Sequence, residues 1–201
     1  VDTPIAETGF TGLAAGAALV GLRPVVEFQF ADFISCAFDP IINVLARHHW
    51  RTGDPMPVTM RAPFGGRLRA GPTHSQSIES YFAHTPGLKV VAVSNPVDAY
   101  WGIQQAIAHP DPIVFLEPKR RYWDKAEVRA EPTYDLHKAA VLREGTDCTL
   151  VAHGPTVATA LTAAAAAAED GVSVGVVDLR SISPLDHDTL RAEARATGRM
   201  V

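Results

Sequence analysis

The sequence is poor in cysteine, has no excess of positive charge and contains no long apolar run, and each absence narrows the possible functions. Its two cysteines, Cys36 and Cys148, lie far apart and form no Cys-x-x-Cys pair. They therefore predict neither a disulfide framework nor a zinc site, and a reducing cytoplasm is the expected location. The net charge of −4 offers no basic surface, so nucleic acid is not an expected partner. The longest apolar stretch, residues 10–22, is short for a membrane span and rich in glycine and alanine, so no membrane partner is expected either.

Common catalytic and binding motifs are missing as well. The chain has no G-x-G-x-x-G loop, no G-x-x-x-x-G-K-[ST] loop and no G-x-S-x-G elbow. His48 and His49 are adjacent and would point apart on a helix, and most other histidines are isolated. The sequence thus predicts no self-sufficient phosphate cradle, no catalytic triad and no histidine metal site.

What is present is a regular alternation of helical and strand-like patterns, which predicts an α/β fold with a mostly parallel sheet. In a first unit, residues 1–124, we expect helices over residues 6–20, 36–50, 75–83 and 96–108, and strands over residues 24–30, 58–61, 88–93 and 113–116. A charged linker, residues 125–146, should lead to a second, smaller α/β unit over residues 147–201, with strands over residues 149–152 and 172–177 and a helix after each.

The helix expected over residues 6–20 is dense in glycine and alanine. Glycine weakens a helix by roughly 1 kcal/mol relative to alanine, so several in one helix call for another explanation. We expect this helix to pack at a subunit interface, where small side chains permit close approach.

Glu7 is the first candidate for chemistry, and two interpretations of it are open. A carboxylate in the first turn of a helix is favoured by the helix dipole by roughly 0.3–1 kcal/mol, which requires no catalytic role. Its neighbours Pro4, Ile5, Ala6 and Gly9 are apolar or small, so the carboxylate could instead be desolvated and suited to proton exchange.

Two further segments could line a site. The strand over residues 24–30 ends in Gln29 and Phe30, with Asp32 and Phe33 following, and ligands gather at strand ends in open α/β sheets. These side chains could hold a flat heterocycle, or the aromatic rings could belong to the core while Asp32 caps the next helix. His74 follows a glycine-rich loop and is either a candidate acid or base or an ordinary surface histidine.

Motifs in the same order along the whole chain resemble the beta subunits of the decarboxylating component of 2-oxo acid dehydrogenases. The motifs are residues 2–7 (DTPIAE), 27–33 (EFQFADF), 74–77 (HSQS), 84–91 (HTPGLKVV), 115–119 (FLEPK), 143–147 (REGTD) and 178–184 (DLRSISP). The resemblance implies a transketolase-type pyrimidine-binding domain that lacks its N-terminal part, followed by an incomplete C-terminal domain of the transketolase type. It places the protein in the cytoplasm, or in the mitochondrial matrix if the source is eukaryotic.

The resemblance also implies a shared cofactor. Thiamine diphosphate would be bound jointly with an alpha subunit in an alpha2beta2 heterotetramer, and a lipoyl acyltransferase core would be a further partner. The magnesium–diphosphate site of the family lies on the alpha chain, within a G-D-G motif. This chain lacks that motif, and Gly53-Asp54-Pro55 is its nearest approach, so the chain alone should bind the cofactor weakly.

The resemblance assigns roles to single residues. Glu7 matches the glutamate that bonds the pyrimidine ring nitrogen and takes part in its proton exchange. Ile5, Gln29 and Phe33 match residues that line the pyrimidine pocket, and Phe33 lacks the hydroxyl of the tyrosine that some members have there. His74 matches a histidine implicated in handing the acyl group to the lipoyl arm.

A structural potassium ion and the substrate are the remaining implications. Some members hold potassium on backbone carbonyls, and the matching positions are Val58, Thr59, Ala106, His109 and Asp111. Residues 29–32 and 117–119 resemble branched-chain enzymes more than pyruvate or acetoin enzymes. The expected function is therefore oxidative decarboxylation of a branched-chain 2-oxo acid, and the alternatives are a pyruvate or acetoin enzyme and a non-catalytic scaffold.

Overall fold

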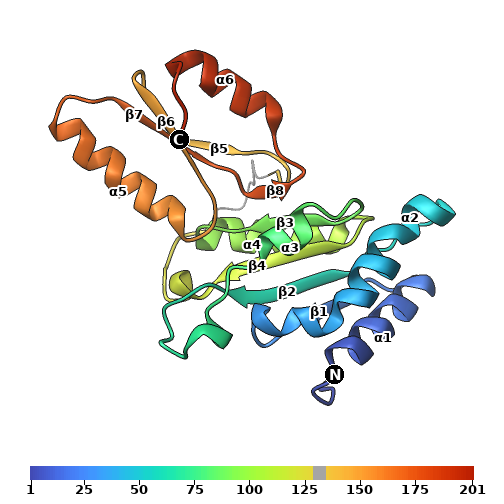
Figure 1. Ribbon diagram of the computed structural model, residues 1–201. Helices are drawn as coiled ribbons and strands as arrows, with labels where there is room; N and C mark the ends of the chain where they lie inside the picture. Colours follow the sequence, from blue (N-terminus) through green and yellow to red (C-terminus); the bar gives the residue numbers. More distant parts are fainter. Residues whose placement is uncertain (129–134) are drawn as a thin grey trace.

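The computed structural model describes residues 1–128 and 135–201, which form two α/β units (Figure 1). The first unit is built around a five-stranded sheet in the order β1-β2-β4-β3-β8, and the second around a three-stranded sheet in the order β5-β7-β6. Strands β1 to β4 run parallel, whereas β8 pairs with β3 in the antiparallel direction. The expected α/β fold with mostly parallel strands is confirmed.

The first unit follows the expected alternation of strands and helices. Its parallel strands are β1 (Val25–Glu27), β2 (Thr59–Phe64), β3 (Lys89–Ala92) and β4 (Ile113–Pro118). Its α-helices are α1 (Glu7–Leu19), α2 (Ala46–Thr52), α3 (Glu79–Ala83) and α4 (Pro96–Ala108). Four short helices of other types connect them: the 3-10 helices η1 (Ala31–Ala37), η3 (Pro72–His74) and η4 (Lys119–Arg121), and the π-helix η2 (Pro40–Leu45).

Helices cover both faces of the first sheet, and this explains the apolar strands. On one face, α1, η1 and η2 pack against β1 to β4 through a large cluster that includes Phe28, Ile41 and Leu116. On the other face, α4 packs through Ala106 against side chains such as Phe115. A strand buried on both faces reads as a nearly continuous apolar run, as β4 does.

The start of α4 shows how the local sequence sets an element. Asn95 accepts a hydrogen bond from the Asp98 N–H at 3.0 Å, and Pro96 occupies the first turn, where its missing N–H is not needed. The start at Pro96 and the end at Ala108 agree with the sequence prediction.

Residues 36–50 are helical throughout, as expected, but a regular α-helix is interrupted by other helix types. The chain instead forms η1, then η2, then α2. Pro40 explains the interruption, because its nitrogen cannot donate to the carbonyl one turn earlier. The segment therefore begins as a 3-10 helix, becomes a π-helix at Pro40 and continues as the α-helix α2 from Ala46.

The second unit contains β5 (Ala140–Arg143), β6 (Cys148–Ala152) and β7 (Val174–Asp178), with α5 (Thr156–Glu169) and α6 (His187–Thr197). Strands β6 and β7 are parallel, and β5 pairs with β7 in the antiparallel direction. Strand β5 lies inside residues 125–146, the segment expected to be a linker. Part of that linker, residues 129–134, lies outside the described residues.

Strand β8 (Ser181–Ser183) lies between β7 and α6 of the second unit and joins the sheet of the first, so the two units share a hydrogen-bonded edge. A polar network reinforces this junction. Ser94 donates a hydrogen bond to the fully buried Asp178, and the Arg180 guanidinium donates to both carboxylate oxygens of Asp98, at 3.0 and 2.9 Å. Burial, only partly offset by hydrogen bonds from Ser94 and from the Arg180 N–H, raises the pKa of Asp178 to about 6.

Two expectations about absent features can be checked on the described residues. Cys36 and Cys148 are both free thiols. Among residues 1–128 and 135–201, no helix is both long and apolar enough to cross a membrane.

Candidate active site

The carboxyl ends of β1, β2 and β4, three neighbouring strands, meet at one edge of the first sheet. The chain after β1 carries Gln29, Phe30 and Phe33, the chain after β2 leads to His74, and η4 begins directly after β4 with Lys119. This edge is where open α/β sheets place their ligands.

His74 packs against two aromatic rings. Its ring centroid lies 4.8 Å from that of Phe30 and 5.4 Å from that of Phe33, and both pairs meet edge to face. The rings of Phe30 and Phe33 are themselves 5.9 Å apart. The structure therefore brings together two side chains that were singled out separately, Phe33 and His74, with Phe30 as the third member of the cluster.

Lys119 lies beneath this cluster and is almost completely buried. Its ammonium nitrogen donates to the His74 carbonyl at 2.6 Å and lies 4.8 Å from the centroid of the Phe30 ring. Burial, which the nearby Asp32 carboxylate opposes, lowers the pKa of Lys119. Burial of the Lys119 cation beside His74 therefore costs folding free energy, because the charge is removed from water.

Asp32 is the second buried charge at this edge. One of its carboxylate oxygens accepts a hydrogen bond from the Gln76 N–H at 3.0 Å, and it makes no capping bond to η1. Its other oxygen, Oδ2, is buried and finds no hydrogen-bond partner among the described residues. The alternative that Asp32 caps the following helix is therefore wrong, because its side chain holds the loop after β2 instead.

The remaining expected residues lie at the start of the chain and along a groove. Glu7 begins α1 and is partly exposed, whereas the Ile5 side chain is 93% exposed. Gln29 is exposed and lines a groove of about 950 Å³ together with Asp2, Thr3 and Phe10, among others. The Thr8 hydroxyl donates to the Cys36 carbonyl and so ties the start of α1 to η1, the element that carries Phe33.

Several of the carbonyls expected to hold potassium accept hydrogen bonds. The Val58 carbonyl accepts the Ile113 N–H, and the Ala106 carbonyl accepts the His109 N–H. At the end of α4, the Arg23 guanidinium donates to the carbonyls of Ile107 and His109, at 2.9 and 3.1 Å. The other two expected positions, Thr59 and Asp111, lie in β2 and just before β4. A permanent cation therefore lies against the His109 carbonyl at this helix end, and potassium at these positions stays a prediction.

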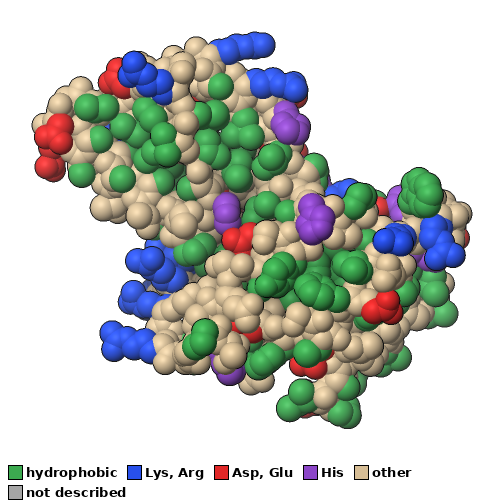
Figure 2. Space-filling model, viewed as in Figure 1, with side chains coloured by type: hydrophobic (Ala, Val, Ile, Leu, Met, Phe, Trp, Pro, Cys, Tyr) green, Lys and Arg blue, Asp and Glu red, His purple; other side chains and the backbone are tan. Residues whose placement is uncertain are grey.

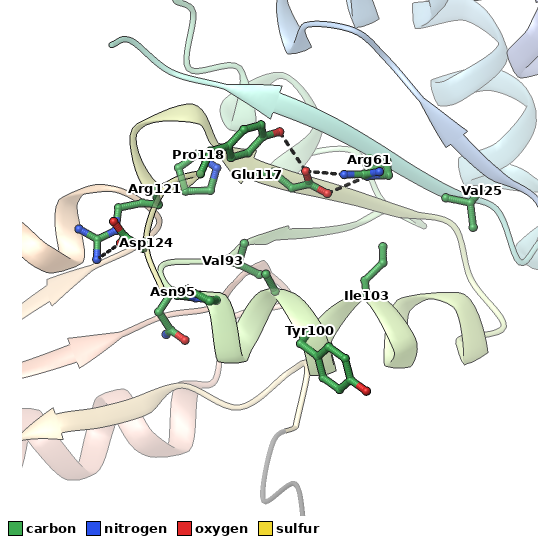
Figure 3. A pocket seen from close by; sticks show the side chains of 13 residues that line it. Val25, Arg61, Val93, Asn95, Tyr100, Ile103, Glu117, Pro118, Arg121 and Asp124 are labelled. Atoms are coloured by element: carbon green, nitrogen blue, oxygen red, sulfur yellow. Dashed lines mark hydrogen bonds and ion pairs between the residues drawn. The ribbon is translucent and has the colours of Figure 1, made fainter. Parts of the chain in front are cut away.

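A second cavity, of about 610 Å³, lies between α4 and the sheet (Figure 3). On its wall the Glu117 carboxylate accepts two bonds from the Arg61 guanidinium, both at 2.8 Å, and a third from the Tyr122 hydroxyl at 3.0 Å. These contacts raise the pKa of Arg61, through its hydrogen bond to Glu117 above all. Glu7, Gln29, Phe33 and His74 are not among the residues that line the cavity, so it is separate from the expected site.

Exposed basic side chains flank the His74 cluster. Arg67 and Arg69 lie in the loop before η3, and Arg120 lies in η4. Figure 2 shows Lys and Arg side chains gathered along this edge of the first unit.

Lys119 and the holding role of Asp32 were missed by the sequence analysis. Lys119 was used only as part of a motif that indicated the substrate class. A lysine at the end of the apolar strand 113–118 was the available signal, because lysine is rarely buried without a partner.

Comparison with known protein families identifies both units. Residues 1–124 match the transketolase pyrimidine-binding domain, and residues 137–201 match the transketolase C-terminal domain. Among solved structures, the chain is similar to a split-gene transketolase described as an inactive beta4 tetramer, with a TM-score of 0.84 and 27% identity over 98% of this chain and 62% of that one. It also shares its fold with a transketolase from Pichia stipitis, at a TM-score of 0.74 and 18% identity over 94% of this chain and 28% of that one.

Curated relatives narrow the family further. The chain is 48% identical to a pyruvate dehydrogenase E1 component subunit beta from Leifsonia xyli and 48% identical to a 3-methyl-2-oxobutanoate dehydrogenase subunit beta from Mycobacterium tuberculosis. It is 44% identical to the beta subunit of an acetoin:2,6-dichlorophenolindophenol oxidoreductase from Bacillus subtilis. Each match covers all of this chain, and the chain spans about 60% of the length of these relatives. The chain therefore belongs to the transketolase family through both of its units, and its relatives include the beta subunits of 2-oxo acid dehydrogenases.

Proposed function

We propose that this chain contributes half of the active site of a thiamine-diphosphate-dependent 2-oxo acid dehydrogenase, as the beta subunit beside an alpha subunit. The observation that carries the proposal is the cluster of His74 with Phe30 and Phe33 at the carboxyl edge of the sheet. Gln29, which directly precedes Phe30 in the chain, lines a groove beside the start of the chain. Within the whole sequence no phosphate-binding motif accompanies this cluster, which suits a site completed by a partner.

The side chains present fit the pyrimidine end of the cofactor. A carboxylate (Glu7), an amide (Gln29) and an aromatic ring (Phe33) offer the hydrogen bonds and the stacking surface that an aminopyrimidine needs. The 93% exposure of Ile5 leaves this half of the site open to a covering partner. The diphosphate and its magnesium ion would be held by the alpha subunit.

Thiamine diphosphate, when bound, supplies the nucleophilic carbon and the electron sink for loss of carbon dioxide. The protein's contribution is orientation and proton control. From the first turn of α1, Glu7 would hold and exchange a proton at the pyrimidine ring nitrogen. Phe33 and Gln29 would fix the ring in the plane that this exchange requires.

His74 would act in the second half of the reaction, acyl transfer to a lipoyl group. In that transfer the lipoyl disulfide breaks, one sulfur bonds to the acyl carbon and the other takes a proton. The electron pair gained by the disulfide balances oxidation of the substrate carbon to the level of a thioester. A histidine beside the site can supply the proton near neutral pH.

We propose a branched-chain 2-oxo acid as the substrate, with pyruvate and acetoin as the alternatives. Residues 29–32 and 117–119 support this choice by their resemblance to branched-chain enzymes. Relatives named for all three substrates occur at 44–48% identity, so turnover must decide. Full-length chain with its alpha partner, thiamine diphosphate and magnesium should oxidise 2-oxoisovalerate faster than pyruvate, and the reverse order would overturn the substrate assignment.

Glu7→Gln tests the proposed chemistry. In the assembled enzyme this variant should lower the rate of decarboxylation by about 100-fold or more, because glutamine cannot exchange the proton. Glu169→Gln, at the exposed end of α5, is the matched control and should retain the wild-type rate. Turnover of Glu7→Gln at the wild-type rate would remove Glu7 from the mechanism. No turnover of any 2-oxo acid by the wild-type assembly would favour a non-catalytic scaffold.

A further inference from the structure

We propose that Lys119 and Asp32 are positioning residues, a two-point clamp on the backbone around His74 that sets this histidine for acyl transfer. The proposal rests on the proposed function and adds to it a specific anchor for the His74 segment. Neither residue touches the reacting groups in this account, so both act through His74.

The first point of the clamp is Lys119. Its ammonium group reaches back from η4 and donates to the His74 carbonyl at 2.6 Å, a contact between residues 45 positions apart. Only 4% of Lys119 is exposed. Its position 4.8 Å from the Phe30 centroid adds a cation–π contact with the same ring that packs against His74.

The second point is Asp32. Its Oδ1 accepts the Gln76 N–H at 3.0 Å, and only 7% of the residue is exposed. The two buried charges therefore bind the backbone on either side of Ser75. Lys119 donates to the His74 carbonyl, and Asp32 accepts from the Gln76 N–H. The Asp32 carboxylate partly compensates the buried Lys119 cation, because it opposes the lowering of the Lys119 pKa by burial.

The backbone around His74 needs these two anchors because its local structure gives it little rigidity. It follows a loop that contains Gly65, Gly66 and Gly71, and two non-glycine residues of that loop, Arg67 and Arg69, have positive φ angles of 110° and 56°. The three-residue helix η3 adds little rigidity. The anchors come instead from the ends of the two strands that flank β2 in the sheet, β1 and β4. The rigid sheet thus determines where His74 lies.

A purely structural role predicts a different outcome from a positioning role. A structural residue, when removed, should lower decarboxylation and acyl transfer together. A positioning residue for His74 should lower acyl transfer selectively, because decarboxylation is assigned to Glu7 and the cofactor. A displacement of about 1 Å can cost on the order of 100-fold in a step that depends on alignment.

The experiment compares the two half-reactions in the full-length chain assembled with its alpha partner, thiamine diphosphate and magnesium. Decarboxylation of 2-oxoisovalerate is followed with 2,6-dichlorophenolindophenol as electron acceptor, and acyl transfer is followed with the lipoylated domain of the acyltransferase. Lys119→Met should reduce the ratio of acyl transfer to decarboxylation by about 10-fold or more. Lys119→Arg, which keeps the cation and its donors, should restore most of that ratio.

Asp32→Asn provides an independent test, which also applies if Lys119→Met fails to assemble. It should reduce the same ratio, to a smaller extent, because asparagine keeps an acceptor for Gln76 but leaves Lys119 without its countercharge. Lys125→Met, at an exposed lysine on the same segment, is the matched control and should leave the ratio unchanged. Equal losses in both half-reactions, or an unchanged ratio in Lys119→Met and Asp32→Asn, would overturn the clamp. Failure of the wild-type assembly to decarboxylate would instead overturn the proposed function.

Discussion

Asp178→Asn should change how the stability of the chain depends on pH. Asp178 is fully buried at the junction of the two units, where burial outweighs hydrogen bonds from Ser94 and the Arg180 N–H and raises its pKa from an ordinary value of 3.8 to about 6. The folded chain therefore keeps this proton at pH values where the unfolded chain has lost it. The difference between the two pKa values corresponds to about 3 kcal/mol.

The direction of the effect follows from the sign of this difference. Well below pH 3.8 the carboxyl is neutral in both states and has no effect on the free energy of unfolding. As the pH rises from 3.8 to 6, the unfolded chain loses the proton that the folded chain keeps, and the wild type should lose up to about 3 kcal/mol from this source. Asparagine does not titrate and still accepts the Arg180 N–H. The variant should therefore gain stability relative to wild type between pH 4 and pH 7.

Urea unfolding of both proteins at pH 4, 5, 6 and 7 measures this gain directly. Asp170→Asn is the control, because Asp170 is exposed at the end of α5 and should show no such trend. A difference between Asp178→Asn and wild type that stays constant across this range would refute the assignment of a buried, proton-retaining carboxyl.

Three further predictions test other parts of the structure. Asp186→Ala should lower the free energy of unfolding by about 2 kcal/mol at pH 7 and by less at pH 3. Burial of the Asp186 carboxylate is outweighed by hydrogen bonds from Thr189, Ala139 and Lys138, which lower its pKa to about 2. Equal losses in urea unfolding at both pH values would contradict this prediction. Gly12→Leu should leave the chain at least as stable as the wild type, since an added Cβ meets nothing within 4 Å. The same variant should weaken association with the alpha chain, measured by sedimentation. Ala165→Leu, at an exposed position of α5, is the control and should leave that association unchanged. Arg23→Met should lower the melting temperature by about 2–4 °C. The melting temperature of this variant should be higher in potassium than in sodium. A melting temperature of the wild type that is also higher in potassium would show that the carbonyls at the end of α4 are open to the ion.

The sequence predicted the order of the first unit because each parallel strand is a separate apolar run bounded by turns. It failed where tertiary pairing decides the conformation. Strand β8 is three residues long and forms because β3 offers a free edge, and β5 lies in a stretch whose charges suggested a linker. Residues 36–50 are helical as predicted, and the helix type changes within the segment because the Pro40 nitrogen cannot donate a backbone hydrogen bond.

The residues of the candidate site could be predicted from the sequence, but the contacts between them could not. Phe33 and His74 were each singled out from local sequence, and only the fold shows that their rings meet. Lys119 and Asp32 could not be linked to His74 from the sequence, because the contact depends on the order of β1, β2 and β4 in the sheet. Arg23 was missed for the same reason, since its partners lie 84 and 86 residues further along the chain.

The most direct test of the central claim is carbon dioxide release from 2-oxoisovalerate by the full-length chain assembled with its alpha partner, thiamine diphosphate and magnesium. Pyruvate is run in parallel, and acetoin cleavage, which releases no carbon dioxide, is followed separately by reduction of 2,6-dichlorophenolindophenol. Our account predicts turnover of 2-oxoisovalerate that exceeds turnover of the other two and is lost in Glu7→Gln. A properly assembled complex that turns over none of the three compounds would contradict it.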